Sequence, residues 1–460
     1  MYQQQNDNSF PELPPFDPEE PARTTHTLSS SRRRLNQYIR GEKIGKGKHG
    51  EVYACRTEDA NAYTMASQIF FYHAVKAVLK FQAHDKMKLL RRNYQQQSQN
   101  GRLPLNSTVN SIRKEIAIMK KCRHGNVVRL IEVIDDPQDE KIYMIMELLP
   151  GGEVQWKNAA NQPILMLRQV RRILRDTILG LEYLHQEGII HRDIKPANIL
   201  YTRDRRSVKI IDFGVAHYTP PSPKSKQAKG KQVEQQNLRS DPYSIDPSLF
   251  PKSDLRKRVG TPSFLAPEVV WVSPDGPDVS PSPSVDYLSP SLTNVSPDQT
   301  STTFSTPAPR QRPPITKAID VWSLGVTFYC LLFGHTPFSA PTENGQSSEF
   351  VLYNKVLSTD WNADDFMGTE RVPTGGRHPP VSDAEGYAVI QLLDHMLQKN
   401  PKHRIDLPEL KAHPWVLRDI DNPREWLQLT SPSDDNQTKS NPNWVKNASK
   451  KILKLIPGTR

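Results

Sequence analysis

The middle of the chain carries two short runs of charged and amide residues whose types and spacing suit chemistry on a phosphate. They are His191-Arg192-Asp193-Ile194-Lys195-Pro196-Ala197-Asn198 and Asp212-Phe213-Gly214, which fit the patterns H-R-D-x-x-x-x-N and D-F-G. In these patterns the first aspartate accepts the proton of an attacking hydroxyl, while the asparagine and the second aspartate hold Mg²⁺ against the phosphates. Asp193, Asn198 and Asp212 are the predicted residues, and Lys195 supplies a cation near the γ-phosphate.

A glycine-rich stretch upstream supplies the residues expected to bind a nucleotide. Residues 44–52 fit G-x-G-x-x-G-x-V, in which the glycines let backbone amides approach phosphates without a clash from Cβ. Further along, His73-Ala74-Val75-Lys76 fits V-A-I-K, and its lysine is expected to bind the α- and β-phosphates. The ATP contacts predicted in this half are Ile44, Gly45, Lys46, Gly47, Gly50, Val52, Ala74 and Lys76.

Lys76 needs an acidic partner, and a helical stretch at 112–121 offers one. Its apolar residues Ile112, Ile116 and Met119 recur at helical spacing, and Glu115 is the predicted partner of the lysine. A buried strand at 142–146 then enters a predicted hinge. There Met146 is expected behind the adenine, and the backbone of Glu147 and of Leu149 at its edge. Glu153 is expected at the ribose, with a plain surface position as the alternative, and Leu200 completes the ATP-binding prediction.

Three further patterns are expected to support these residues. Gly260-Thr261-Pro262 opens a segment that ends in Ala266-Pro267-Glu268, and Thr261 is predicted to hydrogen-bond Asp193 and Lys195. Asp320 begins an apolar helix and is predicted to bond the backbone of the catalytic loop. Arg404 is predicted to form a buried ion pair with Glu268, of a kind whose rupture costs about 3–5 kcal/mol.

With these motifs in place, residues 38–417 resemble a eukaryotic protein kinase, and Lys195 is typical of the Ser/Thr type. The resemblance is closest to the calcium/calmodulin-dependent protein kinase kinases, and the polar inserts and the 151–154 hinge resemble fungal members. It implies an α+β, two-lobed fold: a small β-rich N-lobe with helix C, a large α-helical C-lobe, and ATP with Mg²⁺ between them. It also implies that the substrates are protein kinases, including relatives of AMP-activated kinase and calmodulin-dependent kinases. The runs that carry it lie at 115–121, 126–130, 132–137, 260–264 and 411–416.

Composition divides the chain into the predicted kinase domain and segments too polar to bury a core. The domain divides into an N-lobe at 38–146, a hinge at 147–153 and a C-lobe at 154–417. Residues 1–37 are expected to be a disordered tail, and 418–460 a regulatory tail. Inserts near 81–110, 219–253 and 273–314 are also expected to be disordered.

The net charge of +11 over 460 residues comes from separate basic clusters, so solvated charge is the preferred interpretation. Nucleic-acid or membrane binding would need aromatic platforms or a strong amphipathic anchor, so neither partner is expected. The three scattered cysteines indicate reduced thiols. No signal peptide is expected, and the most apolar run, at 321–333, is too short to span a bilayer. We therefore expect a cytoplasmic protein, with the nucleus as a second location.

Two segments suggest how activity is controlled. The activation-segment position that is phosphorylated in many kinases falls at 256–258, where the sequence is Arg-Lys-Arg, so we hypothesise activity without phosphorylation there. Ser253 is the nearest hydroxyl that could compensate. The tail at 443–460 alternates lysines with apolar residues and is a candidate for binding calmodulin or blocking the active site. A helix packed on the C-lobe or a solvated tail is the alternative.

Two other functions stay open from the sequence. The chain could be a Ser/Thr kinase acting on proteins other than kinases. It could also be a pseudokinase that acts as a scaffold, although such proteins usually lack the lysine or one of the two aspartates, and all three are present.

Overall fold

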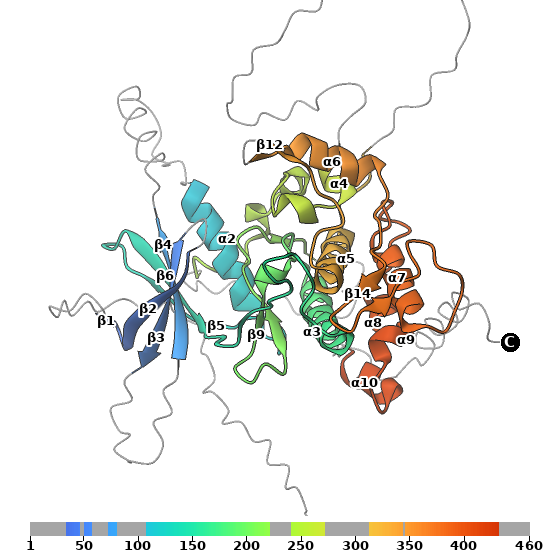
Figure 1. Ribbon diagram of the computed structural model, residues 1–460. Helices are drawn as coiled ribbons and strands as arrows, with labels where there is room; N and C mark the ends of the chain where they lie inside the picture. The colour runs from blue at the N-terminus through green and yellow to red at the C-terminus, as the bar shows by residue number, and fades with distance from the viewer. Residues whose placement is uncertain are drawn as a thin grey trace, which may run out of the picture.

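The computed structural model describes residues 34–46, 50–57, 72–80, 107–220, 241–271, 312–343 and 346–431. A lobe built on one twisted sheet precedes a lobe built mainly of helices, and helix α2 lies beside the sheet (Figure 1). The predicted two-lobed α+β fold is confirmed.

The small lobe is a six-stranded antiparallel sheet in the order β1-β2-β3-β4-β6-β5. Its strands are β1 (Arg34–Leu35), β2 (Tyr38–Lys46), β3 (Gly50–Thr57), β4 (Tyr72–Leu79), β5 (Leu130–Asp135) and β6 (Lys141–Glu147). In β4, Ala74 and Lys76 share one face and Val75 takes the other, since side chains alternate along a strand. Val75 joins a small cluster with Tyr38 and Ile145, so the remaining face of β4 is left for the site.

Helix α2 (Ser107–Lys121) is the predicted helix C and begins five residues before the predicted start. Its apolar residues Ile112, Ile116 and Met119 are each at most 2% exposed and pack in the main core. This burial fixes the rotation of the helix about its axis, and so fixes the direction in which Glu115 points.

The large lobe is organised around α3 (Leu167–Gln186) and α5 (Ala318–Phe333). Helix α5 is apolar on nearly every side and buried along almost its whole length, as expected of a helix at the centre of a domain. The other helices are α4 (Pro267–Val270), α6 (Glu349–Ser358), α7 (Glu385–Met396), α8 (Leu407–Lys411), α9 (Pro414–Leu417) and α10 (Pro423–Leu429). The 3₁₀ turns within the described residues are η1 (Pro196–Asn198), η3 (Pro247–Leu249), η4 (Lys252–Arg256) and η5 (Pro262–Phe264).

The large lobe also contains several small sheets of short strands. Strand β9 (Ile199–Tyr201) lies between β7 (Gly152–Glu153) and β10 (Val208–Ile210), and β8 (Ile189–Ile190) pairs with β11 (His217–Tyr218). Two hairpins lie further along: β12 (Thr342–Glu343) with β13 (Gln346–Ser347), and β14 (Phe366–Met367) with β15 (Val372–Pro373). Strand β8 ends directly before the catalytic loop at 191–198, and strand β9 begins directly after it.

The ends of the folded domain differ from the predicted ones. Strand β1 pairs with β2 through Arg34 and Leu35, so the disordered tail predicted to run to residue 37 is wrong from residue 34 onward. At the other end, the buried Lys411 ammonium donates to Glu182 and to the carbonyl of Thr430, which holds the segment around α10 on the large lobe. The described structure therefore continues past the predicted domain end at 417, through residue 431.

The insert predicted near 219–253 is also partly ordered. Residues 241–253 are described, and Tyr243 and Phe250 within them are 2% and 5% exposed. The polar composition of the insert concealed these two aromatic anchors. Residues 107–110 likewise belong to α2, and Arg312 donates to the carbonyls of Glu268 and Val269. The rest of the predicted inserts (81–106, 221–240 and 273–311), the N-terminal residues 1–33 and the C-terminal residues 432–460 lie outside the described residues.

The structure shows the state of the three cysteines and the place of the most apolar run. Cys55, Cys122 and Cys330 are buried and free. Among the helices within the described ranges, none combines the length and apolar character that crossing a bilayer requires. The apolar run at 321–333 is the interior of α5.

Candidate active site

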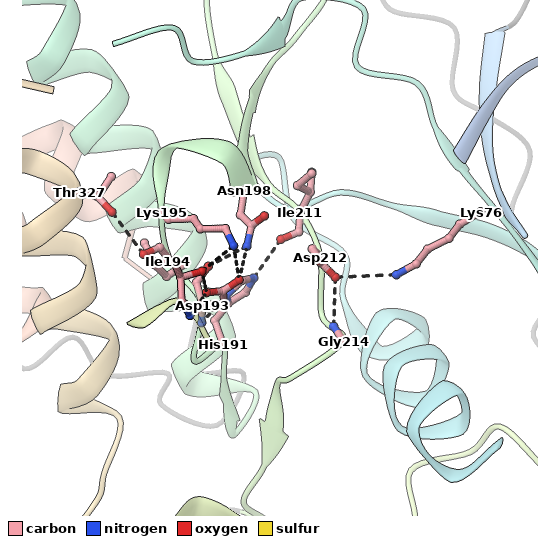
Figure 2. A network of polar contacts seen from close by, with 11 residues as sticks. Lys76, His191, Asp193, Ile194, Lys195, Asn198, Ile211, Asp212, Gly214 and Thr327 are labelled. Carbon is pink, nitrogen blue, oxygen red and sulfur yellow. Dashed lines mark hydrogen bonds and ion pairs between the residues drawn. The ribbon is translucent and has the colours of Figure 1, made fainter. Parts of the chain in front are cut away.

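The catalytic loop is fixed to helix α5 from below. The Asp320 carboxylate accepts the backbone N–H groups of His191 (2.9 Å) and Arg192 (2.8 Å), as predicted. The Thr327 hydroxyl, two turns later, donates to the carbonyl of Ile194 at 3.3 Å (Figure 2). Thr327 was missed in the sequence, although its spacing of seven from Asp320 puts both residues on one face of the helix.

Four donors position the Asp193 carboxylate. Oδ1 accepts from the backbone N–H and the hydroxyl of Thr261 at 2.8 and 2.7 Å. Oδ2 lies 2.8 Å from Lys195 Nζ and 3.0 Å from the Asn198 amide nitrogen. Lys195 also donates to the Thr261 hydroxyl at 2.6 Å, so both contacts predicted for Thr261 are confirmed. This geometry presents a fixed, hydrogen-bonded carboxylate that can receive a proton from a hydroxyl.

Lys76 and Glu115 meet across the gap between β4 and α2. Lys76 Nζ lies 2.5 Å from Glu115 Oε1 and 3.7 Å from Asp212 Oδ1, and Figure 2 shows Lys76 and Asp212 pointing toward one another. Burial alone would lower the pKa of Lys76, but the two carboxylates outweigh it and raise that pKa. The ammonium is therefore charged and held where a phosphate can reach it.

Asp212 and Asn198 have the donor atoms that magnesium prefers. Burial would raise the pKa of Asp212, but the positive charge of Lys76 and the N–H of Gly214 hold it below its ordinary value, so the carboxylate is ionised. The Asn198 amide nitrogen is committed to the carbonyl and carboxylate of Asp193, which leaves its oxygen as the possible ligand. Within the described ranges no group of three or more His, Cys, Asp or Glu could hold a metal alone. Two protein oxygens plus substrate phosphates are the usual arrangement for Mg²⁺, so these residues fit it.

The predicted adenine site is apolar and bounded by the hinge. Ala74 and Leu149 are buried, and Val52, Met146 and Leu200 are partly buried. The remaining predicted ATP contacts divide by exposure: Gly45 is partly buried, whereas Ile44 and Lys46 are exposed near the end of β2, and Gly47 lies outside the described residues.

The structure limits what three of the predicted ATP-binding residues can do. The Glu147 carboxylate is bonded to Lys209 (2.7 Å) and to the Arg129 N–H (2.8 Å), so only its backbone is left for a nucleotide. A Cβ at Gly50 would lie 2.2 Å from the Ala77 carbonyl oxygen, so only glycine fits there. Glu153 lies opposite Leu200 in the strand pairing and is exposed, and its ribose contact stays a prediction.

The predicted ion pair beneath the activation segment is confirmed. Arg404 grips Glu268 with two parallel bonds of 2.7 and 3.0 Å, and neither side chain is exposed at all. It ties the end of the segment that carries Thr261 to the base of the large lobe.

Arg192 and Asp212 adopt left-handed backbone conformations, with φ of 70° and 64°. Such conformations are costly outside glycine and concentrate at functional sites. The Arg192 guanidinium donates to the backbone carbonyls of Asp254 (3.0 Å) and Lys257 (2.8 Å). Burial lowers the pKa of Arg192 to about 10, which still leaves it charged at neutral pH.

Comparisons with known proteins agree with this geometry. The protein kinase domain family matches residues 38–296 and 288–416 of the chain. The serine/threonine-protein kinase ssp1 of Schizosaccharomyces pombe is 35% identical over 406 residues, which are 88% of this chain and 46% of that protein. SNF1-activating kinase 1 of Saccharomyces cerevisiae is 33% identical over 406 residues, covering 86% of this chain and 29% of the relative.

A plant protein is also similar to this chain, at lower sequence identity. The serine/threonine-protein kinase GRIK2 of Arabidopsis thaliana is 29% identical over 387 residues, 83% of this chain and 66% of its own length. The chain thus spans less than half the length of the two fungal relatives. The chain belongs to the protein kinase family, and the relatives it is similar to are serine/threonine protein kinases and a SNF1-activating kinase.

Proposed function

We propose that this chain transfers the γ-phosphate of ATP to the activation-segment threonine of other protein kinases, among them kinases of the AMP-activated type. One observation carries the choice of substrate: the similarity to SNF1-activating kinase 1 over 86% of the chain. The name of that relative describes a kinase that activates SNF1, and the family resemblance of the sequence implies kinases as substrates. The geometry of the site supports the transfer itself, because Lys76, Glu115, Asp193 and Asp212 already lie in contact with their expected partners.

The residues divide the reaction between them. The substrate hydroxyl attacks the γ-phosphorus, its proton passes to Asp193, and the bond to the β-phosphate breaks so that ADP leaves. Lys76, held by Glu115, positions the phosphates, and Lys195 stabilises the charge of the phosphoryl group in transfer. Asn198 and Asp212 would hold magnesium together with the nucleotide, and the ion would neutralise phosphate charge. Thr261 keeps the Asp193 carboxylate oriented through its two bonds to Oδ1.

The proposal is tested with purified protein, ATP and Mg²⁺. The substrates are catalytically inactive forms of an AMP-activated-type kinase and a calmodulin-dependent kinase, each also with its activation-segment Thr replaced by Ala. Phosphate should appear on the Thr of at least one target, and should be absent from its Ala form and from reactions with Asp193→Asn enzyme. Phosphorylation of a generic peptide but of neither kinase would favour the alternative, a Ser/Thr kinase with other protein substrates.

Calmodulin binding remains a separate prediction, because residues 443–460 lie outside the described residues. A peptide of residues 438–460 is expected to bind calmodulin only with Ca²⁺ if the tail is a calmodulin switch. Its matched control replaces Lys450, Lys451 and Lys454 with Gln, which keeps the apolar residues. No binding of the parent peptide at micromolar concentration would remove the prediction.

A further inference from the structure

The activation segment contacts helix α2 at a point remote from the catalytic residues. Tyr243 is 2% exposed, and its hydroxyl donates to Asp135 Oδ2 at 2.5 Å, at the end of β5. Asp135 also pairs with Lys80 at 2.8 Å. Asp241, two residues before Tyr243, accepts the backbone N–H of Tyr243. Its carboxylate also forms a 2.6 Å ion pair with Lys120 of α2. The Tyr243 ring is therefore held in place from both the sheet and the helix.

A second contact lies further along the same segment. Asp254 is 9% exposed, and its carboxylate pairs with Lys114 of α2 at 2.7 Å and with Lys257 at 2.6 Å. Its backbone carbonyl accepts from Arg192 of the catalytic loop. Lys114 also lies 5.6 Å from the ring of the buried Phe250. Asp254 thus contacts helix α2 with its carboxylate and the catalytic loop with its backbone carbonyl.

We propose that residues 241–257 form a strap that holds α2 against the catalytic loop, with Tyr243 and Asp254 as positioning residues for the Lys76–Glu115 pair. The strap grips α2 at Lys114 and Lys120, which are about 9 Å apart along a helix of this geometry. Glu115 lies between them. Two grips of this kind resist both sliding and tilting of the helix, either of which would pull Glu115 away from Lys76.

The same contacts account for an activation segment without a phosphate. A phosphate placed there would have to neutralise Arg192 and a cation of helix C. In this chain the carbonyls of Asp254 and Lys257 satisfy Arg192, and the Asp254 carboxylate neutralises Lys114. Burial would raise the pKa of Asp254, but Lys114 and Lys257 hold it below its ordinary value, so the anchor is ionised at neutral pH. The inference rests on kinase activity and not on which protein is the substrate.

Tyr243→Phe is the sharpest test, because it removes the hydroxyl and keeps the buried ring. Losing a hydrogen bond to a charged acceptor should shift the docking equilibrium of α2 by about tenfold or more. Amide hydrogen exchange in residues 107–121 should rise by a similar factor, and kcat for a generic peptide should fall about threefold or more. Tyr143→Phe is the matched control, since the Tyr143 hydroxyl donates to Asp139 at 2.9 Å elsewhere in the same lobe. It should leave both readouts within about twofold of the parent.

A charge exchange provides the rescue. Lys120→Asp should loosen α2 in the same way, and the double variant with Asp241→Lys should restore exchange and kcat toward the parent values. Unchanged exchange in 107–121 for both Tyr243→Phe and Lys120→Asp would overturn the strap, as would a loss of activity without any change in α2. Hydrogen exchange needs no substrate, so it still tests the strap if neither proposed kinase target is phosphorylated.

Discussion

Replacing Glu268 with Ala should destabilise the protein strongly. The substitution removes both acceptors of the Arg404 fork and leaves a guanidinium that is 0% exposed without a counter-charge. Two backbone carbonyls, of Gln398 (3.0 Å) and Ala318 (2.7 Å), still accept from Arg404, and the Trp322 ring lies 5.3 Å from it. These contacts hold the side chain in its buried position but do not neutralise it.

The expected loss follows from that burial. Breaking a fully buried ion pair by removing one partner costs about 3–5 kcal/mol. For a folded region of about 300 residues, each kcal/mol lowers Tm by about 1–2 °C, so Tm should fall by about 3–10 °C. Thermal unfolding followed by circular dichroism, at one pH and protein concentration, measures the shift. Lys43→Ala is the matched control: Lys43 and Glu51 also lie 2.5 Å apart, but both are about 40% exposed, so little change is expected.

The double variant separates the charge from the packing. Glu268→Leu with Arg404→Met removes both charges and keeps apolar bulk, and such replacements of buried pairs are often close to neutral. It should therefore be more stable than Arg404→Met alone, which leaves the Glu268 carboxylate buried without its partner. A fall of less than about 1 kcal/mol for Glu268→Ala, or a double variant no better than Arg404→Met, would refute the reasoning.

Three further predictions concern the catalytic base, the activation segment and a buried histidine. Asp193→Asn should lower kcat by about 10²–10⁴-fold, because the amide cannot take the proton; steady-state kinetics measure the loss, a thermal melt checks that the variant is folded, and near-normal turnover would contradict the role. Phosphatase-treated enzyme should keep its activity, because the carbonyls of Asp254 and Lys257 already satisfy Arg192; loss of nearly all activity would show that a phosphate is needed. Burial lowers the pKa of His217 from its ordinary value near 6.5 to about 4, so the unfolded chain binds the extra proton first as pH falls. Relative to His217→Gln, the parent should thus lose stability, by about 1–3 kcal/mol, between pH 6.5 and 4, measured by urea unfolding; parallel pH profiles would contradict it.

The sequence by itself determined the reaction class and the residues that meet at its centre. Asp193, Asn198 and Asp212 sit at fixed spacings because one short loop and one hairpin must bring them together, so their order in the chain is enough to assign them. Two buried contacts that support the site were also predicted from the sequence and confirmed: those of Asp320 with the catalytic loop, and the Glu268–Arg404 ion pair. Asp320, Glu268 and Arg404 each belong to a short sequence motif that can be recognised without knowing which distant residue it contacts.

Only the tertiary structure decided how the activation segment is held. Tyr243 lies in a stretch whose polar composition predicts disorder, and its partner Asp135 is 108 residues away. Lys114 and Asp254, which pair across 140 residues, are a second example. Lys411 is a third: it donates to Glu182 and also to the carbonyl of Thr430, which lies beyond the predicted domain end. A single aromatic or charged residue in a polar stretch carries no periodic signal. Its burial depends on which distant surface it meets, and that is fixed when the two lobes and the segment pack together.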